Sequence, residues 1–194
     1  MKREIPVVPK TAIIGATGFI GKFFFAAHRE IYGDCIGTNR DASRKDLSYL
    51  DLLSPESAPL KLAQSGHREA LILAGIAKPS LFEKEKELKR NVSVDGTLNL
   101  IQQLVDEGIK PIFFSSDSVF DGVTGHYDEE SLPNPLNEYG RLKAEIEAGA
   151  REICVGGNYL IIRISKVFSL DKGDGTLFDE MAAILRSGGR VRAA

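Results

Sequence analysis

The sequence predicts an α/β fold in which a parallel sheet is doubly wound, with helices on both of its faces. Short apolar, β-branched segments alternate along the chain with longer helix-like stretches, which is the rhythm of repeated βαβ units. The segments 70–75 (ALILAG) and 111–116 (PIFFSS) are apolar almost throughout. Strands buried on both faces have this composition, so these two are expected at the centre of the sheet.

The remaining elements follow in chain order. Strands are expected at 11–16, 35–39 and 159–165, on either side of the two central ones. One long helix is expected over 79–107, and its alternating charges at 83–90 predict a solvated face. Its inner stripe is predicted to consist of Val92, Leu98, Ile101, Leu104 and Val105. No internal repeat, low-complexity tract or linker divides the chain, so a single domain over 1–194 is expected.

Composition excludes several classes of function. The chain has 194 residues, with 25 Lys and Arg against 27 Asp and Glu. This balance argues against a nucleic-acid or membrane-surface protein, whose binding depends on a strongly basic field. No apolar run has the length of a signal peptide or a membrane span. Cys35 and Cys154 form no CxxC motif, and a reducing cytoplasm is the expected location.

No metal site is expected either. The three histidines, His28, His67 and His126, have no metal-ligand spacing. No GxSxG motif or catalytic cysteine context is present, which makes hydrolase chemistry a poor fit. A small-molecule ligand is therefore the better expectation for this chain.

A glycine-rich turn between the first strand and the first helix predicts a dinucleotide site. Gly15, Gly18 and Gly21 have GxxGxxG spacing, and glycine there allows unusual torsions, close approach to a pyrophosphate and tight helix packing. The helix N-terminus would face the anion with free N–H groups. A purely structural turn is the alternative. The residues expected at the cofactor are Gly15, Thr17, Gly18, Phe19, Ile20 and Gly21, and the fold is predicted to be of the Rossmann type.

The end of the second strand bears on the choice of nucleotide. Asn39 and Arg40 end the strand, and Arg44 follows shortly after. An arginine offers a donor fork for a 2′-phosphate, so NADP(H) is the preferred cofactor. Asp41 would accept hydrogen bonds from a ribose hydroxyl and keeps NAD(H) possible. Ordinary loop cations remain the alternative interpretation.

The segment 50–54 (LDLLS) places Asp51 and Leu52 at the end of an expected third strand. Its polar and apolar side chains, Asp51 and Leu52, would then lie at the carboxyl edge of the sheet. They are predicted to contact the adenine edge of the cofactor.

Three polar side chains are the candidate catalytic residues. Ser116 ends the strand 111–116, and Tyr139 and Lys143 are four residues apart at the start of an amphipathic helix. A free phenol has a pKa of roughly 10, and a nearby ammonium lowers it toward the range useful for proton transfer. Lys143 would also reach the nicotinamide ribose, and Ser116 would donate to a substrate carbonyl. Taken alone, the Tyr–Lys spacing is equally typical of a helix surface.

Together these features resemble a known family. The segments GATGFIG, NVSVDGTLNLI, SSDSVFDG, PLNEYGRLKAEIE and LIIRISKVFS occur in the order of its markers. The sequence is similar, over nearly its whole length, to the extended short-chain dehydrogenase/reductases, and within them to the dTDP-4-dehydrorhamnose reductase group. The resemblance implies NADP(H)-dependent reduction of a nucleotide-linked 4-keto-6-deoxy sugar, in polysaccharide or deoxysugar biosynthesis. Tyr139 would donate the proton, Lys143 would anchor the ribose, and Ser116 would be the catalytic hydroxyl.

The resemblance implies further contacts with the cofactor. Asn91 would support the active-site lysine through a structural water. Ala74, Gly75 and Ile76 would run beside the cofactor ribose, and 163–168 would bracket the nicotinamide. A homodimer is a possible assembly.

Departures from the family pattern keep two alternatives open. Ser118 stands where the reductases have a tyrosine, and Lys166 replaces an aromatic residue. The small C-terminal domain that grips the nucleotide sugar is expected to be largely absent from 1–194. The first alternative is a non-catalytic NAD(P)-binding regulatory or scaffolding relative. The second is a nucleotide-sugar epimerase or dehydratase, although dehydratases carry an acidic pair and only Asp117 is present here.

Overall fold

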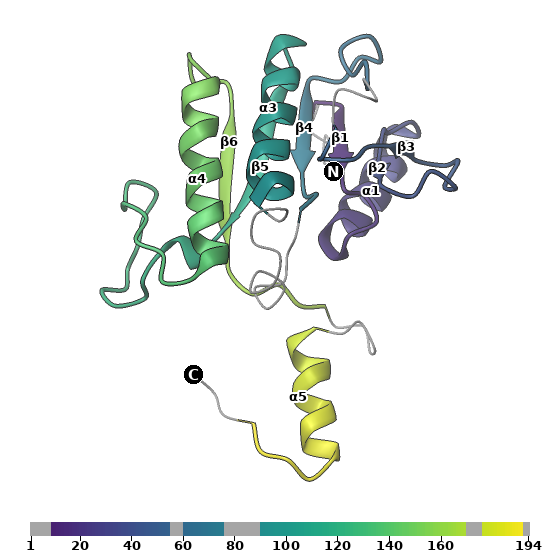
Figure 1. Ribbon diagram of the computed structural model, residues 1–194. Coiled ribbons are helices and arrows are strands. Elements are labelled where there is room, and N and C mark those ends of the chain that lie inside the picture. The colour runs from purple at the N-terminus through teal and green to yellow at the C-terminus, as the bar shows by residue number, and fades with distance from the viewer. Residues whose placement is uncertain (1–8, 55–59, 76–89, 170–175, 192–194) are drawn as a thin grey trace, which may run out of the picture. The chain divides into compact units, whose positions relative to one another are not determined.

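The computed structural model describes residues 9–54, 60–75, 90–169 and 176–191 (Figure 1). Ile76 and most of the charged run 83–90 lie outside these residues, as does the beginning of the helix expected over 79–107. The chain divides into two compact units, Met1–Arg163 and Ile164–Ala194, although no linker in the sequence announces the division. In the described part of the chain, no helix combines the length and the apolar character needed to cross a membrane.

A four-stranded sheet forms the centre of the first unit, in the order β1 (Thr11–Ile14), β4 (Glu69–Ile72), β5 (Lys110–Ser116) and β6 (Leu160–Ile164). β1 pairs in parallel with β4, and β4 pairs in parallel with β5. Two short parallel strands, β2 (Thr38–Asn39) and β3 (Ser48–Tyr49), continue beside β1, where Ile13 bridges to Gly37. The predicted parallel sheet is therefore confirmed, with β4 and β5 at its centre.

Helices lie on both faces of this sheet, as the sequence predicted. They are α1 (Phe19–Tyr32), α3 (Gly96–Asp106), which the π-helical turn η3 (Asn91–Asp95) precedes, and α4 (Glu138–Ile153). Alternate strand residues point to opposite faces. Ile14 and Ile72 therefore join the larger core with α3 and α4, whereas Ile13 and Leu71 pack toward Phe25 of α1. The second unit contains α5 (Leu177–Arg186), where Phe178 packs edge-on against Phe168.

Two local expectations need revision. The third strand was expected to end at Asp51 and Leu52, but β3 already ends at Tyr49, and the Asp51 carboxylate accepts the Leu53 N–H at 3.1 Å to form a turn. Leu50 and Leu52 are buried by this turn, which explains their apolar character without a strand. In the expected inner stripe of the long helix, Ile101 and Leu104 are buried. Val92, Leu98 and Val105 are only partly buried at its margin.

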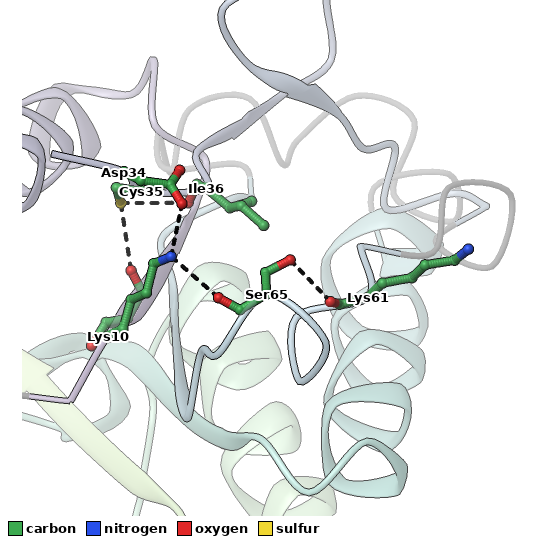
Figure 2. Close-up of polar contacts among 7 residues, drawn as sticks. Lys10, Asp34, Cys35, Ile36, Lys61 and Ser65 are labelled. Carbon is green, nitrogen blue, oxygen red and sulfur yellow. Dashed lines mark hydrogen bonds and ion pairs between the residues drawn. The ribbon is translucent and has the colours of Figure 1, made fainter. Parts of the chain in front are cut away.

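Polar contacts close the amino edge of the sheet (Figure 2). Lys10, just before β1, donates to the Asp34 carboxylate at 2.9 Å and to the Ser65 carbonyl at 3.2 Å. Cys35 directs its thiol at the Thr11 carbonyl, 3.5 Å away. These contacts join the end of α1 and the loop before β4 to the first strand, which leaves the opposite, carboxyl edge for a site.

Candidate functional site

The turn between β1 and α1 is built around glycines that no other residue replaces without strain. Gly15 has φ +92°, and a Cβ there would lie 2.7 Å from the Ala74 nitrogen. A Cβ on Gly21 would lie 2.1 Å from the Gly15 carbonyl oxygen, so the first turn of α1 packs directly on the loop. Gly18 begins the helix without a side-chain cap. The N–H groups at this helix end thus remain directed at the carboxyl edge, where an anion binds favourably.

A cleft of about 270 Å³ opens beside this turn. Most of the residues predicted to bind a cofactor line it: Gly15, Thr17, Gly18, Asn39, Arg40, Asp51, Leu52, Ala74 and Gly75. The structure adds four that sequence reasoning missed, namely Thr38, Leu50, Leu73 and Val92. It does not place Phe19, Ile20, Gly21, Asn91, Tyr139 or Lys143 in the lining. A polar residue at the end of β2 was the available signal for Thr38, whose hydroxyl accepts the Gly15 N–H at 3.0 Å.

The loop after β2 separates its charges. Arg44 forms a two-pronged ion pair with Asp46, with both N···O distances 2.8 Å. Asp41 accepts hydrogen bonds from the Ser43 N–H at 2.9 Å and hydroxyl at 2.7 Å, which hold the pKa of its carboxyl below the usual value. Arg40 is exposed, and it alone carries a positive charge among the described residues that line the cleft.

The beginning of α4 brings Tyr139 next to Ser116. The Asn137 side chain caps the helix by accepting the Gly140 N–H at 2.8 Å. A Cβ on Gly140 would lie only 2.0 Å from the Ser118 carbonyl oxygen, so the helix packs closely on the 3₁₀ turn η4 (Asp117–Val119) that follows Ser116. The hydroxyls of Tyr139 and Ser116 share a hydrogen bond in this arrangement.

The ammonium of Lys143 is directed at the backbone of β5. Its Nζ donates to the Phe114 carbonyl at 2.7 Å and lies 4.5 Å from the centre of the Phe113 ring. The centre of the Tyr139 ring is 5.8 Å away. Burial lowers the pKa of Lys143 to about 8, and the nearby Glu147 carboxylate partly opposes this shift.

The expectation that Lys143 lowers the pKa of Tyr139 is wrong for this arrangement. Burial raises the pKa of the Tyr139 phenol, and the hydrogen bond with Ser116 only partly offsets it. The negative charge of Asp117 raises it further. The Lys143 ammonium lies over the ring and bonds to a main-chain carbonyl, so it gives the phenolate little support. Tyr139 therefore keeps its proton at neutral pH, which suits a proton donor better than a base.

A second, smaller cavity lies under these residues, between α3 and α4. Tyr139 and Lys143 line it from one side and Ser93 and Thr97 from the other. Ala74 and Gly75 also line it, so the two cavities share the chain that leaves β4. Tyr139 and Lys143 thus border a cavity next to the glycine-turn cleft and not the cleft itself, and Ser116 lines neither cavity.

Arg163 has different partners from those that the family resemblance implied. Its guanidinium binds the carboxylate of Glu147, with Nη2 to Oε2 at 2.8 Å, and does not line the cleft. Glu147 is completely buried and was not among the predicted site residues. Its position, four residues after Lys143 on the same helix face, was the signal that could have found it.

Comparison with known proteins assigns the family. The family profile described as RmlD substrate binding domain matches residues 10–193. The chain belongs to this family. Among solved structures, a dTDP-4-dehydrorhamnose reductase from Yersinia enterocolitica is 26% identical, with a TM-score of 0.75 over 93% of this chain and 61% of that one. The expected membership of the extended short-chain dehydrogenase/reductases and the Rossmann-like fold are both confirmed.

Two further relatives in the comparison differ in what their names state. The Bacillus anthracis dTDP-4-dehydrorhamnose reductase, solved in complex with NADP, is 23% identical with a TM-score of 0.74, over 95% of this chain and 61% of that one. The methionine adenosyltransferase 2 subunit beta of Xenopus tropicalis is 32% identical over 140 residues, which are 71% of this chain. The matched region is 41% of that subunit, so the chain spans less than half of this curated relative.

Proposed function

We propose that the chain binds NADP(H) in the cleft beside the glycine turn and reduces a nucleotide-linked 4-keto-6-deoxy sugar. The observation that carries this proposal is that Tyr139, with Ser116 beside it, and Lys143 border a cavity that shares Ala74 and Gly75 with that cleft. The glycines support it as well, because a Cβ at Gly15 or Gly21 would collide with the backbone of Ala74 or Gly15, so only glycine permits the tight turn that a pyrophosphate approaches in such folds.

Each residue has a definable task in this reaction. The bound cofactor supplies a hydride to the carbonyl carbon. Tyr139, with its raised pKa, stays protonated at neutral pH and delivers its proton to the carbonyl oxygen. Ser116, whose hydroxyl donates to the Asp117 carboxylate at 3.1 Å, would stabilise the negative charge that develops on that oxygen once the hydroxyl turns from Asp117 to the substrate. Lys143 is available to ribose hydroxyls once it leaves the Phe114 carbonyl.

The preference for NADP(H) over NAD(H) depends on Arg40. Of the two arginines after β2, Arg44 is already paired with Asp46, whereas Arg40 lines the cleft. A guanidinium there would bind a 2′-phosphate with two parallel hydrogen bonds. The Asp41 carboxylate is directed at Ser43, which leaves it poorly placed for the ribose diol that NAD(H) offers.

Titration of NADPH and NADH, each followed by assay with a dTDP-linked 4-keto-6-deoxyhexose, tests the proposal. We expect NADPH to bind more tightly and its absorbance to fall on turnover. Tyr139→Phe should abolish turnover and keep NADPH affinity, and Arg40→Ala should weaken NADPH by about tenfold or more with little effect on NADH. Arg44→Ala is the matched control for charge in the same loop. Failure to bind either nucleotide would contradict the proposal.

A second function is favoured by the curated relatives. Methionine adenosyltransferase 2 subunit beta is by its name one subunit of a larger enzyme, and it shares 32% identity with this chain. A regulatory or scaffolding protein that uses NADP(H) as a structural ligand would also bind the cofactor in the cleft. Tight NADPH binding without turnover, unchanged in Tyr139→Phe, would favour this second function.

A further inference from the structure

A buried ion pair lies directly behind the proton-transfer residues. Glu147 is one helical turn beyond Lys143 and two beyond Tyr139, and its side chain is 0% exposed. Arg163 of β6 binds it through Nε at 3.1 Å and Nη2 at 2.8 Å, in the forked geometry that only a guanidinium provides. Arg151 approaches the same carboxylate at 3.5 Å from the exposed side of α4. The pair therefore fixes α4 to the sheet at the level of the site.

The other face of the Arg163 guanidinium holds the chain that follows Ser116. Its Cζ lies 4.9 Å from the centre of the Phe120 ring, and its Nη1 reaches the Ser131 carbonyl at 3.5 Å. The Phe120 ring stacks on Tyr127, with centroids 4.2 Å apart and planes 6° from parallel. The guanidinium of Arg163 thus packs on a pair of stacked rings that belongs to residues 117–134.

Further contacts close this segment on itself. Asp121 accepts hydrogen bonds from the Tyr127 hydroxyl and, at 2.8 Å, from the Asn134 amide. The Asn134 N–H donates to the Val119 carbonyl, also at 2.8 Å. The segment 117–134 is therefore held together by its own hydrogen bonds, and it begins at Asp117, the residue next to Ser116. Among the described residues, only Arg163 connects this segment to α4 and β6 through an ion pair and a cation–π contact.

We propose that Arg163, held in place by Glu147, is a positioning residue that fixes the 117–134 segment against α4 and so keeps the Ser116 hydroxyl at Tyr139. The catalytic part of this role rests on the proposed reductase function. The structural part does not. Arg163 binds Glu147 with its planar fork and packs on Phe120 with its flat face at the same time. A positive charge alone is therefore insufficient for this role.

Hydrogen exchange read by mass spectrometry on the full chain tests the structural part. In Arg163→Lys and in Arg163→Met, we expect exchange in residues 117–134 to accelerate by about tenfold or more, because breaking a buried pair leaves an uncompensated charge or a lost contact. Exchange in residues 11–21 should not change. Arg151→Met is the matched control, since it removes a cation from the same carboxylate without touching the segment.

Two results would overturn the proposal. One is Arg163→Lys with the exchange pattern of the unmodified chain, because charge alone would then suffice. The other is equal acceleration in Arg151→Met, because the segment would then respond to the charge balance at Glu147. If Arg163→Met does not fold, Glu147→Gln replaces it, and unchanged exchange in 117–134 in that variant counts against the proposal.

Kinetics separate this inference from the proposed function. With turnover in the unmodified chain, Arg163→Lys should lower kcat by about tenfold while the NADPH dissociation constant stays unchanged. A merely structural residue would weaken NADPH binding and turnover together. Without turnover in the unmodified chain, the reductase proposal fails, while the exchange experiment still decides whether Arg163 positions the segment.

Discussion

The two edges of the sheet are constructed differently. At the amino edge, Lys10 pairs with Asp34, and their side chains are 24% and 83% exposed; the other contacts in Figure 2 join side chains to backbone carbonyls. Three groups in costly settings lie at the carboxyl edge. They are Gly15 with its positive φ, Lys143 with its lowered pKa, and Ser93, whose buried hydroxyl has no described partner. The first edge satisfies its polar groups, and the second keeps several of them in unfavourable settings.

The fold gives up stability mainly at the carboxyl edge. Groups held in costly environments cluster at sites that bind or react, because the surrounding structure must impose the arrangement. The amino edge has two exceptions. His67 is completely buried, and its two ring nitrogens have no described hydrogen-bond partner, and the buried Nε2 of His28 has none either. The predictions that follow measure the cost at each edge.

The largest effect is expected for Lys143→Met at the carboxyl edge. The pKa of Lys143 is lowered from 10.5 to about 8, so the ammonium is penalised in the folded state at neutral pH. At pH 7, the free energy of unfolding of the variant should be higher than that of the unmodified chain by about 2–3 kcal/mol. Chemical denaturation measures this value. In the unmodified chain, stability should rise with pH between about 8 and 10.5, where only the folded state has lost the proton, and the variant should lack this rise.

Lys45→Met is the control for this prediction. Lys45 also donates to a backbone carbonyl, that of Ala42 at 3.4 Å, but from an exposed position. Its replacement should leave both the stability and its pH dependence nearly unchanged. Equal stabilisation by both variants would remove the argument from burial.

Gly140→Ala should have the next largest effect, in the opposite direction. Alanine favours a helix over glycine by about 1 kcal/mol, but its Cβ would lie 2.0 Å from the Ser118 carbonyl oxygen. Overpacking of this kind costs about 1–3 kcal/mol, so the net change in the free energy of unfolding should be destabilising. Gly149→Ala in the same helix meets only the movable end of Leu98 and should be milder. Denaturation curves that rank the two variants the other way would contradict the packing argument.

His67 should produce a pH effect at the amino edge. Burial lowers the pKa of this imidazole, and the Lys10 ammonium lowers it further. Stability is therefore lost as the pH falls through 6.5, where the unfolded chain gains a proton that the folded chain refuses. Between pH 7 and pH 5, we expect the denaturation midpoint to change less in His67→Phe than in the unmodified chain. His126→Asn, at an exposed position with φ +52°, should not.

The smallest effect is expected for Lys10→Met, which breaks the amino-edge ion pair. Exposed pairs of this kind contribute little, because water screens both charges. The denaturation midpoint should barely move, and a double-mutant cycle with Asp34→Asn should give a coupling near zero. A coupling as large as the Lys143 effect would remove the contrast between the two edges.

The sequence predicted the parts of this molecule that are set by local pattern. Apolar runs located the central strands, and the strand–glycine–helix context located the cleft. The third strand was located, but its end was placed too late, because Leu50 and Leu52 are buried by a turn, which periodicity does not distinguish from a strand.

The proton-transfer site shows a second limit. Spacing placed Tyr139 and Lys143 on one helix face, but it carried no information about the acceptor that the ammonium would find. That acceptor is the Phe114 carbonyl, 29 residues away in sequence. Glu147 was missed for the same reason. A charged residue on a helix is normally solvated, and the burial of Glu147 depends on its ion pair with Arg163 of β6.

The shared lining of the two cavities has a consequence for how the site responds to a ligand. Ala74 and Gly75 form a common partition, and Gly75, with φ +141°, has open space around it. An occupant of the larger chamber would press on the same peptide that borders Tyr139. Thermodynamic reciprocity then requires that any change in Tyr139 protonation upon occupancy be matched by an equal change of affinity with pH.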